Sequence, residues 1–131
     1  MQPLTPEKEQ ELVDLLVYLR KLMAEEFPIK DSVICHDVVL KIIQAHLRNE
    51  KMMFKQFYAL FPYSEIGIRN QLVRLAGENW IRLDRSTENL RSKIIQAEPK
   101  LIEAWERVCS RLDETYAPDN LGRLRAEPEE D

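Results

Sequence analysis

Three polar residues of one predicted helix have the types and spacing to bind the edges of nucleic-acid bases. The apolar residues of this segment repeat at the spacing of a single helix face: Ile68, Leu72 and Leu75. If that face is turned to the core, Arg69, Asn70, Val73 and Arg74 point outward. Arginine can make two hydrogen bonds to guanine, and asparagine can make two to adenine. The sequence therefore predicts a helix whose outer face can read DNA.

Both ends of this helix carry strong boundary signals. Ser64 is a natural N-cap, and Tyr63 before it can pack on Ile68 as a hydrophobic staple. At the other end, Asn79 stands where a left-handed residue is wanted, and Trp80 can fold back on the helix. We therefore expect the helix to begin and end within a residue or two of these positions.

The elements around this helix follow the order of a winged helix-turn-helix. A short helix over 53–61, with aromatic residues on one side, precedes the turn at 61–64. Two short strands, 80–83 and 93–96, enclose the polar stretch 84–92. In such a motif the second helix enters the major groove, and the hairpin tip reaches the neighbouring backbone or minor groove.

Three further helices are predicted outside this motif. The first covers about 5–27, with Thr5 as N-cap and Pro28 as the stop, and the second covers 33–47 and is apolar around much of its circumference. The last opens at Pro99 and reaches 116. The apolar stripes of the first and last helices are wider than one small lobe can cover, so we expect a homodimer that largely buries Trp105 and Leu112.

Charge supports nucleic-acid binding only locally. The chain has a net charge of −4, so composition alone does not indicate a nucleic-acid partner. Between Ser64 and Lys100, however, there are seven basic residues against five acidic ones. The positive charge is concentrated where the motif predicts contact.

Over about 53–100 the chain resembles the MarR (multiple antibiotic resistance regulator) family. The resemblance lies in the run from Ser64 to Leu75, in Asn79-Trp80-Ile81 and in the hairpin ending Asn89-Leu90-Arg91-Ser92-Lys93. It implies a homodimeric transcription regulator whose terminal helices interlock, in a family where many members respond to phenolic ligands or oxidants. By this resemblance Arg91 falls on the wing arginine. The full set of residues expected to contact DNA is Ser64, Gly67, Arg69, Asn70, Arg74, Arg91 and Lys93.

Three positions depart from the family pattern. Asn89 stands where the wing usually has an aspartate, Asn79 where a glycine usually follows the helix, and Ala97-Glu98 where a Leu-Thr pair commonly opens the last helix. These departures bear on the internal brace of the wing and on any ligand response, and not on the fold.

The predicted fold is thus mainly α-helical, a winged helix-turn-helix with long terminal dimerisation helices and a two-stranded β wing. Residues 1–117 form one domain, with the DNA-binding lobe at about 53–100, dimerisation helices at about 5–27 and 99–116, and an acidic, disordered tail at 118–131. The predicted partners are double-stranded DNA, a second copy of the chain and a small-molecule effector of unknown identity. The alternative function is a winged-helix protein-interaction module, such as a phage or plasmid accessory protein, that does not read DNA.

Other candidate sites have simpler structural explanations. Cys35 could sense peroxide, but it lies on an apolar helix with no evident activating cation, so a buried structural thiol is favoured, and Cys109 is expected in the core. His36 and His46 share no helix face and complete no metal site. A set of four aromatic residues could line a ligand pocket, but their spacing favours core packing: Phe54, Phe57, Tyr58 and Phe61.

The sequence offers no support for an enzyme or a membrane protein. There is no nucleophile elbow, phosphate-binding glycine loop or HExxH motif, and no cofactor is implied. Charges interrupt every apolar segment, so none reaches the length of a membrane helix. The start of the chain is acidic, unlike a signal peptide, so we expect a reduced, cytoplasmic protein.

Overall fold

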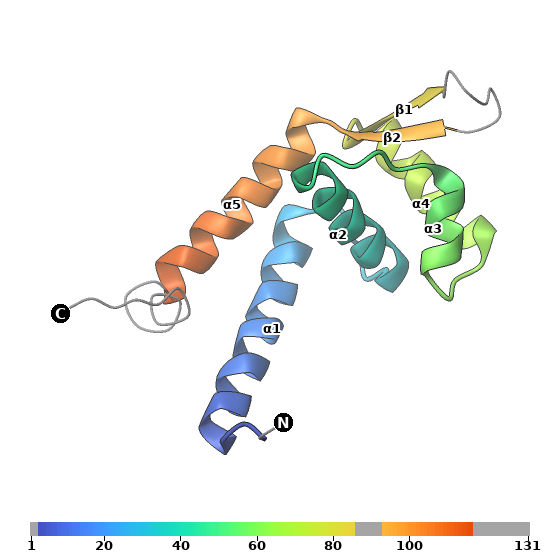
Figure 1. Ribbon diagram of the computed structural model, residues 1–131. Coiled ribbons are helices and arrows are strands. Elements are labelled where there is room, and N and C mark those ends of the chain that lie inside the picture. Colours follow the sequence, from blue (N-terminus) through green and yellow to red (C-terminus); the bar gives the residue numbers. More distant parts are fainter. Residues whose placement is uncertain (1–2, 86–92, 117–131) are drawn as a thin grey trace.

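Within the part of the chain that the structure describes, five helices and a two-stranded hairpin follow one another in the order that the sequence predicts (Figure 1). The computed structural model describes residues 3–85 and 93–116. The elements are α1 (Pro6–Glu26), α2 (Val33–Leu47), α3 (Phe54–Leu60), α4 (Glu65–Gly77), β1 (Ile81–Arg85), β2 (Lys93–Ala97) and α5 (Pro99–Tyr116). The prediction of a mainly helical winged helix-turn-helix is confirmed. No helix within the described ranges is long and apolar enough to cross a membrane.

Helix α2 lies at the centre of the core, as its all-round apolar sequence predicts. Ser32 is its N-cap and accepts a hydrogen bond from the backbone N–H of Cys35 at 3.1 Å. The helix packs against α4 and β2. Its buried residues are Cys35, Val38, Val39, Ile42, Ile43 and Ala45.

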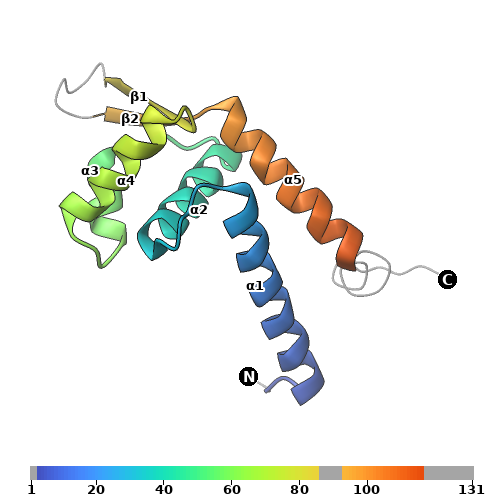
Figure 2. The same ribbon diagram turned by 180° about the vertical axis from the view of Figure 1, so that it is seen from behind.

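Helices α1 and α5 lie side by side and antiparallel (Figures 1 and 2). Near the end of α1, Glu26 pairs with Arg107 at 2.7 Å, and the hydrogen bond from Arg107 lowers the pKa of the Glu26 carboxyl. At the far end, the rings of Tyr18 and Tyr116 meet edge to face, 5.9 Å between centroids. Among the described residues this pairing ends at Tyr18, so the first half of α1 extends beyond α5.

The wing is an antiparallel hairpin whose register runs from Ile81 opposite Ala97 to Arg85 opposite Lys93. Its strands are each slightly longer than predicted. The segment before α3 joins them, because Met53 forms a bridge with Ile94 and the Met52 carbonyl accepts from Ile95 N at 2.8 Å. This pairing has no periodic signal in the sequence. The wing tip, residues 86–92, lies outside the described residues, and Asn89 and Arg91 lie with it.

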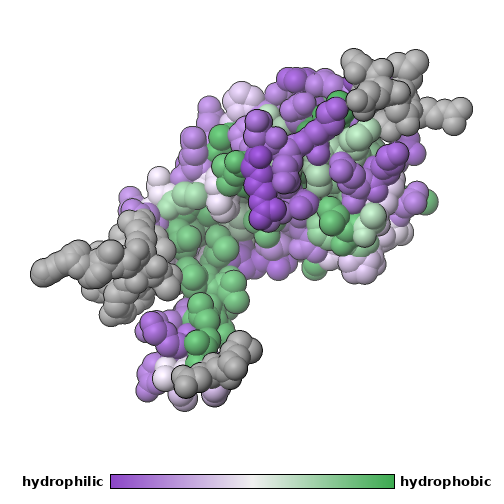
Figure 3. Space-filling model, viewed as in Figure 1, coloured by the Kyte–Doolittle hydropathy of each residue, from purple (hydrophilic) through white to green (hydrophobic). Residues whose placement is uncertain are grey.

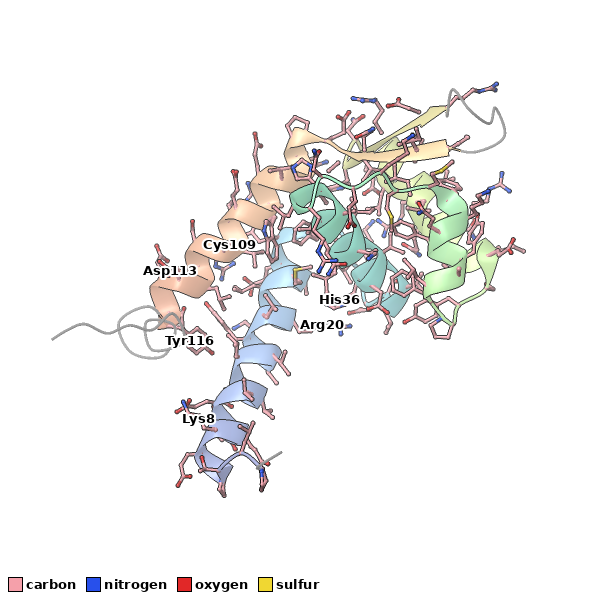
Figure 4. All side chains as sticks on the ribbon, viewed as in Figure 1. Lys8, Arg20, His36, Cys109, Asp113 and Tyr116 are labelled. Carbon is pink, nitrogen blue, oxygen red and sulfur yellow. The ribbon has the colours of Figure 1, made fainter. Side chains whose placement is uncertain are left out.

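One expected core residue of α5 is at the surface. Cys109 is exposed, and Figure 4 labels it on α5, away from α4. The prediction that it is a core thiol is therefore wrong: the buried side of α5 is carried by Leu101, Ala104 and Val108. Trp105 and Leu112 are half-buried within one chain.

Candidate nucleic-acid interface

Helix α4 follows the turn after α3 and begins where its N-cap predicts. The side-chain oxygen of Ser64 accepts a hydrogen bond from the backbone N–H of Gly67 at 3.0 Å. This cap satisfies one of the donors that every helix leaves unpaired at its start. The capping role of Ser64 is confirmed, and it fixes where the first turn of α4 points.

The two faces of α4 divide as the spacing predicts, with one addition. Ile68, Leu72 and Leu75 are fully buried. The exposed side carries Arg69, Asn70 and Val73, and also Ile66, which is 72% exposed. Ile66 was not among the residues predicted to face outward, although it lies three and four positions before Arg69 and Asn70 and therefore shares their face.

Gly67 belongs to the packed side of α4. A Cβ atom at this position would lie 3.1 Å from the Cδ1 atom of Ile34 and 3.1 Å from the Oγ atom of Ser64. Its lack of a side chain therefore allows the first turn of α4 to approach α2 closely. Its expected contact with DNA stays a prediction, and the structure adds that it packs against α2.

Arg74 does not point outward, so that prediction is wrong. The two hydrogens of its guanidinium Nη2 are shared among three acceptors: the carbonyl oxygen of Pro28 at 2.9 Å, the Oε1 atom of Gln71 at 2.8 Å and the Sγ atom of Cys35 at 3.2 Å. Its Nη1 atom lies 3.5 Å from Glu78. Helical spacing places Arg74 between the buried and exposed faces, and acceptors on other elements draw it inward.

The contact with Arg74 also corrects the expectation that Cys35 has no cation beside it. The thiol is fully buried, and burial raises its pKa although the neighbouring guanidinium of Arg74 lowers it. The thiol donates to the Pro28 carbonyl at 3.6 Å. The predicted burial of Cys35 is confirmed, and its environment favours the protonated thiol.

The far end of α4 is closed by a Schellman motif. Asn79 has a left-handed backbone with φ of 67°, and the backbone N–H of Trp80 donates to the carbonyl of Leu75 at 2.9 Å. Lys100 of α5 donates to the Glu78 carbonyl at 2.9 Å and lies 4.3 Å from the centre of the Trp80 ring. The predicted boundary at Asn79 is confirmed, and α5 holds this end in place.

Besides the contact of Arg74 with Cys35, a polar contact holds the start of α4 to α2. The hydroxyl of Tyr63 donates to the Oδ2 atom of Asp37 at 2.6 Å. This hydrogen bond raises the pKa of Tyr63, because losing the proton would place two negative charges together. The ring of Tyr63 stacks on Phe61 at 6.1 Å between centroids. The turn before α4 is thus anchored to the central helix.

Only part of the predicted basic charge faces solvent without internal pairing. Arg82 bonds both carboxylate oxygens of Asp84 at 3.0 Å and lies 3.6 Å from Glu98. Arg85 and Lys93 are exposed and face each other at the last described pair of the wing. Of the predicted basic residues that the structure describes, Lys93 on the wing and Arg69 on α4 are therefore exposed to a partner. Three others make internal contacts: Arg74, Arg82 and Lys100.

A groove of about 540 Å³ lies beside α2. Phe61 and Trp105 contribute aromatic rings to it, and Lys41, Arg48 and Asp37 contribute charge. Four aromatic residues were considered as the lining of a ligand pocket, with core packing favoured. Phe57 is fully buried in the core, as favoured, whereas Phe61 lines the groove.

Comparison with solved structures identifies the fold. No family model and no curated sequence matches the chain. The transcriptional regulator Tm0710 from Thermotoga maritima is 13% identical with a TM-score of 0.63, over 85% of this chain and 76% of that one. NadR in complex with 4-hydroxyphenylacetate is 12% identical with a TM-score of 0.60, over 90% and 83%. Wild-type MarR from E. coli is 10% identical with a TM-score of 0.56, over 95% and 93%. The chain therefore has the winged helix-turn-helix fold of the MarR-family transcriptional regulators.

Proposed function

We propose that the protein is a homodimeric, sequence-specific DNA-binding regulator of transcription, not an enzyme. The observation that carries this proposal is the outer face of α4. Arg69 and Asn70, whose side chains suit base edges, are exposed there between Ile66 and Val73. No hydrogen bond or ion pair within residues 3–85 and 93–116 holds Arg69 or Asn70, so both can turn toward a base.

The wing supplies the second contact of the proposal. Base contacts specify a sequence, whereas contacts with phosphate groups orient the protein on the duplex. Lys93 and Arg85 close the described part of the hairpin and are exposed. These two residues form a positive group suited to phosphate, and Arg91 lies between them in the sequence.

The dimer is supported by the exposed half of α1. This part of the helix carries four exposed aliphatic residues at helical spacing: Leu12, Val13, Leu16 and Val17. Figure 3 shows an apolar strip along it, between the N-terminus and the body of the molecule. Leu16 and Val17 are 63% and 65% exposed, an unfavourable arrangement for an isolated chain. A second copy, related by a two-fold axis, would bury both strips at once.

An effector is a further part of the proposal. NadR was solved with 4-hydroxyphenylacetate, and PefR from Streptococcus agalactiae with heme. The groove beside α2, with Phe61, Trp105 and two cationic side chains, suits a small aromatic anion. A cytoplasmic location agrees with this role.

Selection of bound sequences from a random duplex pool, followed by titration at several salt concentrations, tests the function. We expect one partly palindromic sequence to be enriched. Its affinity should fall steeply with salt, by a log-log slope of about 0.9 for each phosphate contact. Failure to enrich any sequence, together with a flat salt dependence, would favour the alternative of a protein-interaction module.

A further inference from the structure

We propose that Arg74 is a positioning residue that locks α4 to the end of α1 and thereby sets the distance between the two DNA half-sites. The contacts of Arg74 belong to the free protein. Their effect on half-site spacing rests on the proposed function, because it needs a dimer with one copy of α4 in each half-site.

The geometry of Arg74 is that of a clamp between elements. Its side chain is 26% exposed, and one terminal nitrogen serves acceptors on three parts of the fold. These are Gln71 on α4 itself, Cys35 on α2 and the carbonyl of Pro28 in the loop between α1 and α2. Charged donors make stronger hydrogen bonds than neutral ones, so this arrangement resists rearrangement.

The loop that Arg74 reaches joins the proposed dimerisation helix to the core. Its residues Lys30 and Asp31 both have left-handed backbones, with φ of 50° and 64°, which is costly for residues with side chains. Surrounding contacts must hold such a loop in place. The hydrogen bond to Pro28 is one of them, and it connects the loop directly to α4.

A role in direct DNA contact would compete with this clamp. To reach a phosphate or a base, Arg74 would have to give up Pro28, Cys35 and Gln71 together. Arg69 faces no such cost, because it is exposed on the outer face. The two arginines of α4 therefore have separate roles. Arg69 faces the major groove of DNA, and Arg74 fixes the orientation of α4 relative to the dimerisation helices.

The first experiment measures the clamp without DNA. In a Cys109→Ser background, which removes the exposed thiol, a thiol reagent reports on Cys35 alone. Arg74→Met keeps much of the side-chain length and removes the donors. We expect the labelling rate of Cys35 to rise about tenfold or more at a temperature where both proteins are folded, because a charged hydrogen bond no longer opposes local opening. Because losing the Arg74 charge also raises the pKa of the Cys35 thiol, the rates are measured over a series of pH values and compared per thiolate. An unchanged rate on that scale would overturn the clamp.

The second experiment measures half-site spacing. Wild type, Arg74→Met, Arg74→Lys and Arg69→Ala are titrated on duplexes whose half-site separation varies by single base pairs. We expect Arg74→Met to lose most of the preference for one separation with its salt slope unchanged, and Arg74→Lys to keep part of it. Arg69→Ala should weaken binding at every separation and keep the same optimum.

The outcomes separate the two proposals. If Arg74→Met keeps the spacing optimum while its salt slope falls by about one unit per phosphate, Arg74 touches phosphate directly and the inference is wrong. If Arg74→Met does not fold, Arg74→Lys serves in both experiments, and unaltered labelling and spacing would overturn the inference. If the wild type binds no duplex, the proposed function fails, while Cys35 labelling still decides whether Arg74 closes the clamp.

Discussion

At the residue scale, position around the helix decides what each arginine of α4 does. Arg69 and Arg74 are five residues apart, which places them about 140° apart around the axis. Arg69 consequently faces solvent, whereas Arg74 lies within reach of α2 and of the loop that follows α1. The same side-chain chemistry serves the proposed recognition in one case and internal packing in the other.

Replacing Arg69 or Asn70 with Ala should weaken binding to the selected duplex by about 1 to 3 kcal/mol and relax the preference at one base pair per half-site. The reason is the loss of hydrogen bonds to a base edge. Titration on the selected site and on its single-base variants measures both effects. Equal losses on every sequence would mean that neither side chain reads a base.

Arg91→Ala should weaken binding to all sequences alike and lower the salt slope by roughly one unit for each phosphate that the wing no longer neutralises. Phosphate contacts carry no sequence information, and the substitution alters both wings of a symmetric dimer together. The same change at Lys93 is expected to act in the same direction. Titration on selected and scrambled duplexes tests this, with folding confirmed by circular dichroism. Unchanged affinity on both duplexes would mean that the wing does not touch DNA.

Ile66 is expected to contact the methyl group of a thymine, the apolar feature of the major groove. Replacing that thymine with uracil removes only the methyl group and should cost the wild type about 1 kcal/mol. The Ile66→Ala protein should lose this sensitivity and respond equally to the two duplexes. A wild type indifferent to uracil at every thymine of the half-site would refute the contact.

At the element scale, α4 is positioned by contacts at its start, middle and end. Ser64 caps the start while Tyr63 reaches α2, Arg74 holds the middle, and Asn79 with Lys100 closes the end. Beyond the Ser64 cap, these contacts join α4 to α2, to the loop after α1 and to α5. An outer face held in this way changes little on binding, which reduces the entropic cost of recognition.

Asn79→Ala should destabilise the fold by about 1 to 2 kcal/mol, because at a left-handed φ of 67° alanine has the strain of a Cβ atom without the short polar side chain that lets asparagine adopt this conformation. Asn79→Gly should be tolerated, since glycine adopts this conformation without strain. Urea unfolding of the three proteins measures the difference in free energy. An alanine variant as stable as the glycine variant would contradict backbone strain at this position.

At the scale of the whole molecule, the exposed half of α1 governs assembly. Leu16→Glu should convert the dimer to a monomer, because a carboxylate buried in an apolar interface is strongly unfavourable. Light scattering at micromolar concentration gives the mass. Leu60→Glu on α3 is the matched control, since Leu60 is 50% exposed on another element, and it should leave the dimer intact.

Two deletions complete this test. Removing residues 118–131 should leave the dimer intact. That result would exclude this segment as the part of the chain that buries the exposed aliphatic residues of α1. Truncation before Pro99 should give monomers or aggregates, because it removes α5, the helix that packs on α1. A wild-type protein that remains monomeric at micromolar concentration would refute the dimer.

Local signals predicted most of the fold because they act within a few residues. The N-caps at Thr5 and Ser64 and the left-handed Asn79 are found where the sequence indicates helix ends. Periodicity predicted the buried side of α4 in the same way. It failed for Cys109 because the apolar stripe predicted for α5 is wider than the side that this chain covers.

The sequence by itself determined the order of elements, their approximate boundaries and the buried face of α4, because caps, turns and periodicity are properties of neighbouring residues. Only the tertiary structure decided the roles of Arg74, Gly67 and Tyr63, whose partners lie on other elements. Pro28 is 46 residues from Arg74, and Asp37 is 26 from Tyr63. A contact of that separation leaves no local pattern, because it depends on how the chain brings distant segments together.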